Sequence, residues 1–355
     1  MSDKVLMKGN EAIAEAAIQA GCMHYFGYPI TPQTEVAAYM AKRMPKIGGT
    51  FLQAESEVSA INMVIGVAST GKRVMTSSSS PGVSLKAEGI SYLAGCDLPA
   101  VVVNVQRGGP GLGGIQPSQS DYFQSTKGGG HGDYRNIVLA PASVQEMASL
   151  TVKAFDLADK YSMVSMILAD GTMGQMMEPV SLDVGEVETY EKPWALTGTK
   201  CEREHNIVNS LYLKPEELEA KNFERYEKYK AIEENEVMYE EYLMDDAEVC
   251  VVAFGITSRV AKNAINEARA NGVKVGMIRP ITVWPFPKKV LAAAAEKCKA
   301  FICVEMSMGQ MIEDVELAIR CKKPVYLCNR VGGMIPTPEE VLAKINEVNE
   351  NGGAF

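Results

Sequence analysis

The sequence lacks the short motifs by which many nucleotide-binding and hydrolytic enzymes are recognised. It contains no Walker phosphate loop, no G-x-G-x-x-G turn leading into a helix and no G-x-S-x-G nucleophile turn. Histidine is scarce, and His24, His131 and His205 do not have the spacing of a paired metal-binding motif. These absences argue against nucleotide hydrolysis, nicotinamide binding, zinc chemistry and serine hydrolysis.

Cysteine is present but never clustered. None of the eight cysteines forms a C-x-x-C pair, whereas iron–sulfur clusters are held by closely grouped thiolates. We therefore expect buried free thiols, a common state of cysteine in proteins, and no metal site on this chain. If the protein transfers electrons, the cluster must lie on another polypeptide.

Long apolar runs and an excess of basic residues are also missing. No apolar run is long enough to span a membrane, and the first residues lack the basic and apolar regions of a signal peptide. With 35 basic and 44 acidic residues the net charge is −9, which argues against nucleic acid because phosphates need a basic surface. We expect a cytoplasmic protein that binds neither membranes nor nucleic acid.

Residues 1–185 alternate apolar strand candidates with helical segments. This alternation predicts an α/β fold, a doubly wound parallel sheet with helices on both faces. The run Val101-Val102-Val103 fits a sheet that is covered on both sides. Strands are predicted near residues 25–28, 50–52, 73–76, 100–105, 137–139 and 163–169, and helices near 10–20, 32–43, 57–69, 83–94 and 143–159.

The rest of the chain divides into a connector and a second domain. Residues 186–245 contain a segment dense in Glu, Lys and Tyr, which predicts a charged helical connector. In residues 246–355 the strand–helix alternation resumes, predicting a smaller α/β domain of ordinary size. Its strands are predicted at 249–254, 273–277, 300–304 and 324–327, and its helices at 259–270 and 288–297.

Three helix starts have recognisable capping residues. Asn10 is expected to cap the first helix. Thr31-Pro32 predicts a capping hydroxyl followed by proline at the first helical position. Thr337-Pro338-Glu339-Glu340 repeats this arrangement, with Glu340 completing a capping box.

Candidate site residues follow the first two strands, since open parallel sheets bind ligands beyond the carboxyl ends of their strands. Thr31, in Gly27-Tyr28-Pro29-Ile30-Thr31-Pro32, places a hydroxyl at a helix entry, which suits an anion such as a carboxylate; the alternative is a simple helix cap. Glu55 and Glu57 begin the next helix. Such carboxylates suit acid–base chemistry in a cleft, but they are also the ordinary arrangement at a helix N-terminus.

Two more segments follow the third and fourth strands. Residues 76–82 include four serines that are costly to bury without partners, so they form either a ligand-facing loop or an exposed turn. Arg107, before the glycine-rich residues 108–114, could grip a carboxylate or form a structural salt bridge. His131 lies in a second glycine-rich loop, where a structural role is the simpler expectation.

Taken in order, these segments resemble the 2-oxoacid:ferredoxin oxidoreductases, specifically the subunit with the pyrimidine-binding domain for thiamine diphosphate. The resemblance covers nearly the whole chain. It continues in the second domain through residues 279–286 and 304–310. That domain resembles the C-terminal domain of transketolase, and we expect it to support assembly rather than chemistry.

The resemblance implies roles for individual residues. Glu57 matches the glutamate that hydrogen-bonds N1′ of the aminopyrimidine ring, so it is expected to be both catalytic and cofactor-binding. Tyr28 and Pro29 are expected beside the same cofactor. Thr31 and Arg107 match positions that hold the carboxylate and oxo group of the substrate.

The resemblance also implies a split enzyme. The family binds the diphosphate through a G-D-G signature and Mg²⁺, but this chain has only Gly132-Asp133-Tyr134. A diphosphate-binding beta subunit is therefore expected to supply the diphosphate site, the Mg²⁺ and a [4Fe–4S] cluster, together with gamma and ferredoxin-like subunits.

The implied reaction is oxidative decarboxylation of a 2-oxoacid to acyl-CoA and CO₂, with coenzyme A and ferredoxin as co-substrates. Residues 4–12, 111–122 and 127–134 most resemble the branch of the family that uses 3-methyl-2-oxobutanoate. Two alternatives stay open, the equivalent 2-oxoglutarate subunit and a non-catalytic scaffold with the same fold. A self-contained thiamine enzyme would need the missing G-D-G motif.

Overall fold

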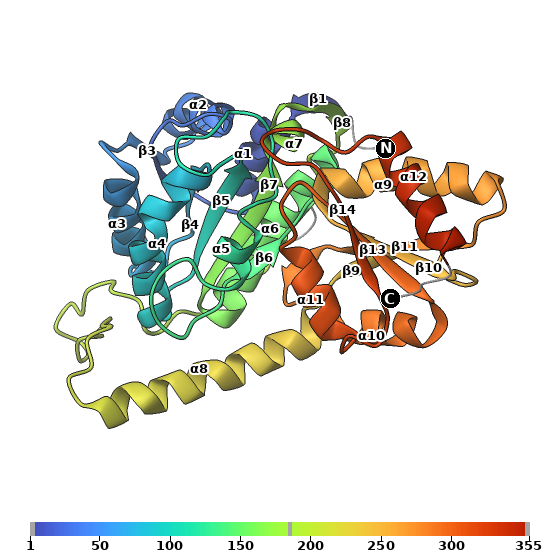
Figure 1. The fold of residues 1–355 in the computed structure, drawn as a ribbon. Helices are drawn as coiled ribbons and strands as arrows, with labels where there is room; N and C mark the ends of the chain where they lie inside the picture. Colours follow the sequence, from blue (N-terminus) through green and yellow to red (C-terminus); the bar gives the residue numbers. More distant parts are fainter. Residues whose placement is uncertain (1–3, 184–186, 352–355) are drawn as a thin grey trace.

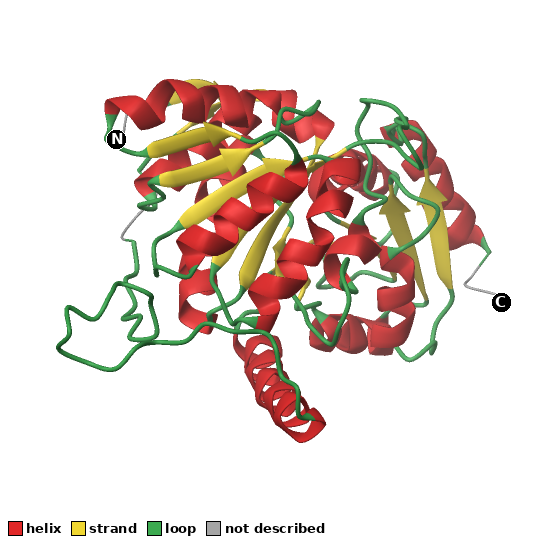
Figure 2. Cartoon of the chain, turned by 90° about the vertical axis from the view of Figure 1, so that its left-hand side faces the viewer, coloured by secondary structure: helices red, strands yellow, loops and turns green. Residues whose placement is uncertain are grey.

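A computed structural model describes residues 4–183 and 187–351, and its centre is a seven-stranded sheet with the order β12-β6-β7-β5-β4-β2-β3 (Figure 1). Six of these strands are parallel, and β12 is antiparallel to β6. Every residue of β4, β5 and β7 is buried, and helices cover both faces of the sheet (Figure 2). The strands are β2 (His24–Gly27), β3 (Thr50–Gln53), β4 (Val74–Ser78), β5 (Ala100–Gln106), β6 (Ile137–Leu139), β7 (Val164–Asp170) and β12 (Thr282–Trp284).

The helices of this domain follow the strands in the expected alternation. The helices α3 and α4 pack against each other, α3 also packs against β4 and α4 against β5, and a second pair, α1 and α6, also pack together. The predicted doubly wound α/β fold is therefore confirmed. The helices are α1 (Gly9–Gln19), α2 (Thr34–Arg43), α3 (Glu57–Ala68), α4 (Ser80–Gly95), α5 (Tyr122–Thr126), α6 (Val144–Tyr161) and α7 (Gly171–Gln175), with a 3₁₀ turn η1 (Met44–Lys46).

The second domain has a five-stranded sheet with the order β14-β13-β10-β11-β9. All of its strands are parallel except β9, which is antiparallel to β11. The strands are β9 (Tyr239–Tyr242), β10 (Val249–Ala253), β11 (Val275–Pro280), β13 (Ala300–Glu305) and β14 (Val325–Asn329), and the helices are α9 (Gly255–Ala270), α10 (Lys288–Lys297), α11 (Met311–Ala318) and α12 (Pro338–Glu350).

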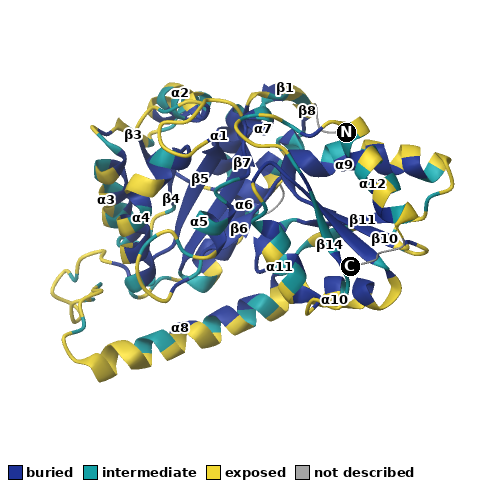
Figure 3. Ribbon diagram, in the orientation of Figure 1, coloured by how far each residue is buried: buried dark blue, intermediate teal, exposed yellow. Residues whose placement is uncertain are grey.

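The connector between the sheets is helical only in part. Its long helix α8 (Pro215–Asn235) buries Arg225, Tyr229 and Ile232 and is otherwise largely solvent-exposed (Figure 3). The end of the predicted connector is the strand β9, which belongs to the second sheet.

Strand pairing ties the two domains together more closely than the sequence indicates. The strand β12 leaves the second domain to extend the first sheet. The pairing of β1 (Val5–Lys8) with β8 (Met177–Val180), by contrast, forms a separate two-stranded sheet within the first domain. A buried side chain adds to the contact between the domains, because Gln119 Nε2 donates to the carbonyl of Phe254 at 2.8 Å and its Oε1 accepts from the Met306 amide at 3.0 Å. The two domains therefore share one continuous interface.

Of the three helix caps predicted from the sequence, one is present in the structure. The capping box of Thr337 and Glu340 is confirmed. The prediction for Thr31 is wrong, because the amide of Gln33 first closes a turn onto the Ile30 carbonyl and α2 starts at Thr34. Asn10 does not cap α1 either.

Asn10 instead lies inside α1. Its amide donates to the Pro32 carbonyl at 2.8 Å and to Glu35 at 2.9 Å. The residue therefore ties α1 to the segment before α2, which is a tertiary role that its position near a helix start did not indicate.

All eight cysteines are free thiols. Five of them are buried, as expected, but Cys201 and Cys321 are exposed and Cys96 is half-buried. None of the helices in residues 4–183 and 187–351 combines the length and apolarity that crossing a membrane requires.

Candidate active site

The turn from β4 into α4 lies at the centre of the candidate site. The strand β4 is fully buried to its last residue, Ser78, and Ser79 is the N-cap of α4. Proline at position 81 suits the first turn of a helix, where no amide partner is needed. The chain therefore turns sharply at the carboxyl edge of the sheet and directs its serines into the protein interior.

Glu57 is the first residue of α3 and is only 5% exposed. Ser56 caps the helix, its hydroxyl accepting a hydrogen bond from the Ser59 amide at 3.1 Å. The N-terminus of α3 favours a negative charge at this place. No residue in the described part of the chain donates a hydrogen bond to the Glu57 carboxylate.

Gly82 of α4 explains how this carboxylate fits against the turn. A Cβ atom at Gly82 would lie 2.6 Å from Glu57 Oε1 and would overlap Ser78 Oγ. Only glycine leaves room for this approach. The carboxylate therefore occupies a slot formed by α4 and the end of β4.

Two further buried groups in the same turn have no partner. Ser78 Oγ and Ser79 Oγ are enclosed and make no hydrogen bond to any residue that the structure describes. A buried polar group without a partner costs roughly 1–3 kcal/mol, and a charged one more. The Glu57 carboxylate and these two hydroxyls all lack hydrogen-bond partners within the described residues. This combination indicates a site where a polar ligand supplies the missing hydrogen bonds.

Lys86 is a buried positive charge close to this slot. Its side chain is fully buried, and its ammonium donates to Thr76 Oγ1 at 2.9 Å. Burial lowers the pKa of Lys86 to about 8, while the negative charge of Glu57 raises it. The two charges therefore interact without forming a direct ion pair.

Arg107 follows β5 and is 7% exposed. Its guanidinium donates from Nη1 to the Thr31 carbonyl and from Nη2 to the Leu112 carbonyl, both at 3.1 Å, which leaves Nε buried without a partner. Its backbone amide donates to Ser80 Oγ at 3.0 Å. The β4–α4 turn thus lies between Glu57 and Arg107, and Arg107 contacts the segment that contains Thr31.

The segment with the predicted binding residues Tyr28, Pro29 and Thr31 lies at the surface. Tyr28 is 36% exposed, and Pro29 and Thr31 are exposed as well. Within the described residues, the Thr31 hydroxyl makes no hydrogen bond. This segment is therefore open to solvent or to another molecule, whereas Glu57 and Arg107 are enclosed.

A cavity of about 670 Å³ opens beside Arg107 at the junction of the two domains. Its wall includes Asp121, which accepts hydrogen bonds from Ser80 Oγ at 2.5 Å and Asn104 Nδ2 at 2.9 Å. Burial raises the pKa of the Asp121 carboxyl, and these two bonds oppose that rise. The apolar part of the wall comes from the second domain, through Met306, Met308 and Val331.

His131 lies away from this turn. Its carbonyl accepts a hydrogen bond from Ser91 Oγ at 2.7 Å, and its ring packs edge-on to Tyr92. Ser91 lies nine positions after Gly82, which is about 13 Å along α4. The loop of His131 therefore covers the far end of α4.

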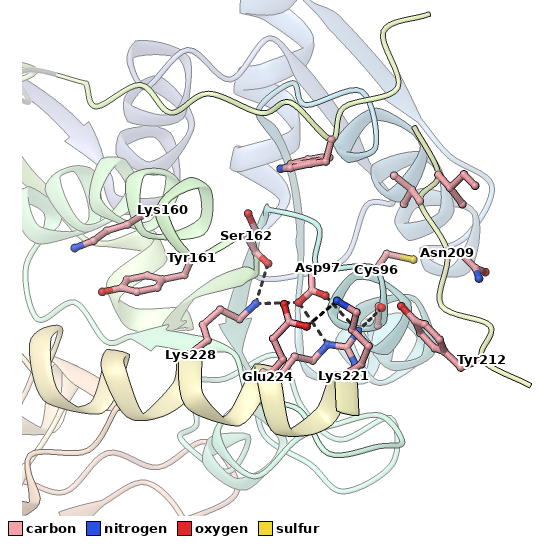
Figure 4. A pocket seen from close by; sticks show the side chains of 15 residues that line it. Cys96, Asp97, Lys160, Tyr161, Ser162, Asn209, Tyr212, Lys221, Glu224 and Lys228 are labelled. Atoms are coloured by element: carbon pink, nitrogen blue, oxygen red, sulfur yellow. Dashed lines mark hydrogen bonds and ion pairs between the residues drawn. The ribbon is translucent and has the colours of Figure 1, made fainter. Parts of the chain in front are cut away.

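A second hollow of about 680 Å³ lies between α8 and the ends of α4 and α6, at the opposite edge of the sheet (Figure 4). The cations in its wall are already paired. Arg225 and Lys228 bind Asp97, and Lys221 binds Glu224. The pairs with Asp97 fasten α8 to the first domain. Lys160, the remaining cation in this wall, pairs with Glu236, so every cation among the described lining residues has a partner.

The sequence analysis singled out Glu57 and Arg107 as candidates, but it did not single out Lys86 and Asp121, which the structure places beside them. A lysine within a helix normally indicates an exposed face. The available signal was its spacing, because Lys86 lies four residues after Gly82 and three before Gly89, on the stripe of α4 that glycines open to a neighbour. No group of metal-binding side chains occurs within the described ranges.

The fold and the family comparison define a class, the α/β proteins with a thiamine diphosphate-binding domain. Residues 15–243 match the family model described as pyruvate flavodoxin/ferredoxin oxidoreductase, thiamine diphosphate-binding, and residues 247–341 match pyruvate:ferredoxin oxidoreductase core domain II. The chain belongs to this family and is a subunit of a 2-oxoacid:ferredoxin oxidoreductase, which confirms the prediction from sequence.

The relatives agree with this assignment. The chain is 54% identical over 344 residues to the ketoisovalerate oxidoreductase subunit VorB of Methanothermobacter marburgensis, covering 97% of each chain. It is 36% identical to the 2-oxoglutarate synthase subunit KorA of the same organism, covering 97% of this chain and 99% of that one.

Two solved structures show the same arrangement. A 2-oxoglutarate:ferredoxin oxidoreductase from Magnetococcus marinus superposes with a TM-score of 0.86 at 29% identity, covering 98% of this chain and 65% of that chain. A split-gene transketolase shares the fold at 14% identity, with a TM-score of 0.63 and full coverage of both chains.

Proposed function

We propose that this chain supplies the aminopyrimidine half of a thiamine diphosphate site, that Glu57 is its catalytic carboxylate and that the oxidised substrate is 3-methyl-2-oxobutanoate. The observation that carries the proposal is the Glu57 carboxylate, which is buried at the carboxyl edge of a parallel sheet and receives no hydrogen bond from residues 4–183 or 187–351. Ligands of such sheets bind at this edge.

The residues around Glu57 fit an aminopyrimidine ring. A protonated ring nitrogen is the donor that the carboxylate lacks, and the exocyclic nitrogen could bond to Ser78 or Ser79, whose hydroxyls are also without partners. Tyr28 and Pro29 would cover the open side of the ring. When bound, thiamine diphosphate supplies the electron sink for decarboxylation of a 2-oxoacid.

Glu57 would hold a proton at the ring nitrogen and so control, through the conjugated ring, the protonation of the exocyclic amino group. Efficient proton transfer needs a fixed carboxylate that is shielded from water. The close approach of α4 at Gly82 provides both conditions, because it fixes Oε1 in place and excludes solvent from that side.

The substrate would bind next to Arg107. The unpartnered Nε and the exposed Thr31 hydroxyl are donors suited to the carboxylate and oxo group. To bind a carboxylate with two parallel N–H groups, the Arg107 guanidinium would have to break its hydrogen bond to the carbonyl of either Thr31 or Leu112.

The wall of the adjoining cavity favours a branched aliphatic acid over 2-oxoglutarate. Its charged lining residues are Arg107 and Asp121, so it holds no second cation for a distal carboxylate. Met306, Met308 and Val331 offer apolar contacts instead. The VorB relatives, which are described as ketoisovalerate oxidoreductase subunits, support the same choice.

The remaining parts of the enzyme would come from other chains. We propose that a beta subunit binds the diphosphate and Mg²⁺ and carries the [4Fe–4S] cluster, with gamma and ferredoxin-like subunits, ferredoxin and coenzyme A completing the reaction. A cytoplasmic location is supported by the eight free thiols, which are typical of reducing compartments.

Reconstitution tests these proposals. The chain would be purified with its partner subunits, and ferredoxin reduction dependent on coenzyme A would be measured with both acids. We expect turnover with 3-methyl-2-oxobutanoate to exceed turnover with 2-oxoglutarate by at least tenfold. Equal turnover, or a preference for 2-oxoglutarate, would refute the substrate assignment.

A further inference from the structure

The contact between α3 and α4 places a buried lysine beside the proposed catalytic carboxylate. Gly82 and Gly89 lie on one stripe of α4, and a Cβ atom at either would press on α3, at Glu57 Oε1 (2.6 Å) and at Ile61 (2.5 Å) respectively. Lys86 lies on the same stripe between the two glycines. It therefore faces the stretch of α3 between Glu57 and Ile61.

The other wall of this slot is β4. Alternate residues of a strand share a face, so Thr76 points to the same side as Ser78, the residue next to Gly82. Lys86 donates to Thr76 Oγ1, its single hydrogen-bond acceptor within the described ranges. The side chain is thus enclosed by α3, α4 and β4, with Glu57 as the charge that faces it.

From this arrangement we propose that Lys86 is a positioning residue, an internal counter-ion that holds the Glu57 carboxylate in its slot without bonding to it. Because its ammonium is held by Thr76, both oxygens of Glu57 stay open to a ligand N–H group. A direct ion pair would occupy those oxygens and oppose binding. The role in catalysis rests on the function proposed above, but the coupling of the two charges does not.

The pH behaviour follows from burial. The pKa of Lys86 is lowered to about 8 by desolvation, and the charge of Glu57 acts against that shift. Near pH 7 the ammonium is still mostly protonated. As the pH rises through about 8, the counter-ion loses its charge, and the support for Glu57 is lost.

The first test uses the chain without cofactor or partner. With ¹⁵N-labelled lysine, the Nζ signal that disappears in Lys86→Met would be titrated by NMR. We expect Glu57→Gln to lower the pKa of Lys86 by about 1 unit or more, the size of shift caused by a nearby opposite charge. Glu55→Gln, on the exposed residue two positions earlier, should leave it unchanged. An unchanged titration in Glu57→Gln would overturn the proposal, even in an active enzyme.

The second test uses the assembled enzyme. Wild type should lose activity above about pH 8, and Lys86→Met should lose about 10²-fold at pH 7, the lower end of a general acid–base contribution, with no further alkaline decline. Thr76→Val removes the acceptor but keeps the charge, so it should shift the decline to lower pH. A merely structural lysine would reduce the rate without moving the pH profile, and that result would refute the proposal. Complete inactivity of the wild-type complex would count against the proposed function alone.

Discussion

Replacing Gly82 by alanine tests whether the position of Glu57 controls activity. The added methyl group would meet Glu57 Oε1 at 2.6 Å and overlap Ser78 Oγ. To reach 3.4 Å, the limit of ordinary contact, the carboxylate must move by about 0.8 Å. Ser78 is fully buried, and a close-packed interior offers little room for adjustment.

The expected result is a large loss of activity with a modest loss of stability. A displacement of about 1 Å at a reacting group can cost roughly 10²-fold in rate. Overpacking typically costs about 1–3 kcal/mol of unfolding free energy, and the better helix propensity of alanine recovers about 0.5–1 kcal/mol of it. Turnover of the assembled enzyme and urea unfolding of the isolated chain measure the two effects.

Gly66 provides a matched control. It lies in the neighbouring helix α3, and a Cβ atom there meets nothing within 4 Å. Gly66→Ala should therefore raise stability by about 0.5–1 kcal/mol and leave turnover unchanged. A Gly82→Ala enzyme that folds normally and turns over at the wild-type rate would refute the argument that this slot fixes the carboxylate.

Two further predictions concern stability and thiol chemistry. Arg279 is buried and bonds both oxygens of Glu146 at 2.7 and 2.8 Å and Glu240 at 2.8 Å. Arg279→Met should cost about 3 kcal/mol in urea unfolding, because it removes the cation from the partly buried Glu146 and leaves Glu240 with Lys262 alone. A change under about 1 kcal/mol would contradict this prediction. Cys201 and Cys321 are exposed and should react first with a thiol reagent at pH 8. Burial raises the pKa of Cys298 to about 11, so its labelling before unfolding would show that the second domain opens.

The sequence predicts the first domain well because its strands are continuous apolar runs. Val101, Val102 and Val103 lie in a strand buried on both faces. A short run of β-branched residues without polar positions is typical of such a strand. Glu57 was also found correctly at a helix start. These features depend on local pattern, which a single sequence contains.

Pairing between distant segments could not be predicted in the same way. The strand β12 follows β11 directly in the chain but joins the sheet of the other domain. It pairs there with β6, a strand far away in the sequence, and only the folded chain brings the two together. Lys86 was missed for a related reason. Lys86 is buried because glycines bring α3 close to α4 and because Thr76, in another element, accepts its hydrogen bond. The sequence near Lys86 contains neither contact and therefore indicates an exposed helix.

The central claim is that the Glu57 carboxylate sets the proton chemistry of the bound aminopyrimidine, and one exchange measurement tests it most directly. The rate at which bound thiamine diphosphate exchanges its C2 proton with D₂O would be compared in wild-type, Glu57→Gln and Glu55→Gln complexes. We predict that Glu57→Gln slows exchange by about 10²- to 10⁴-fold and that Glu55→Gln exchanges at the wild-type rate. Equal exchange in the Glu57→Gln and wild-type complexes would contradict the account.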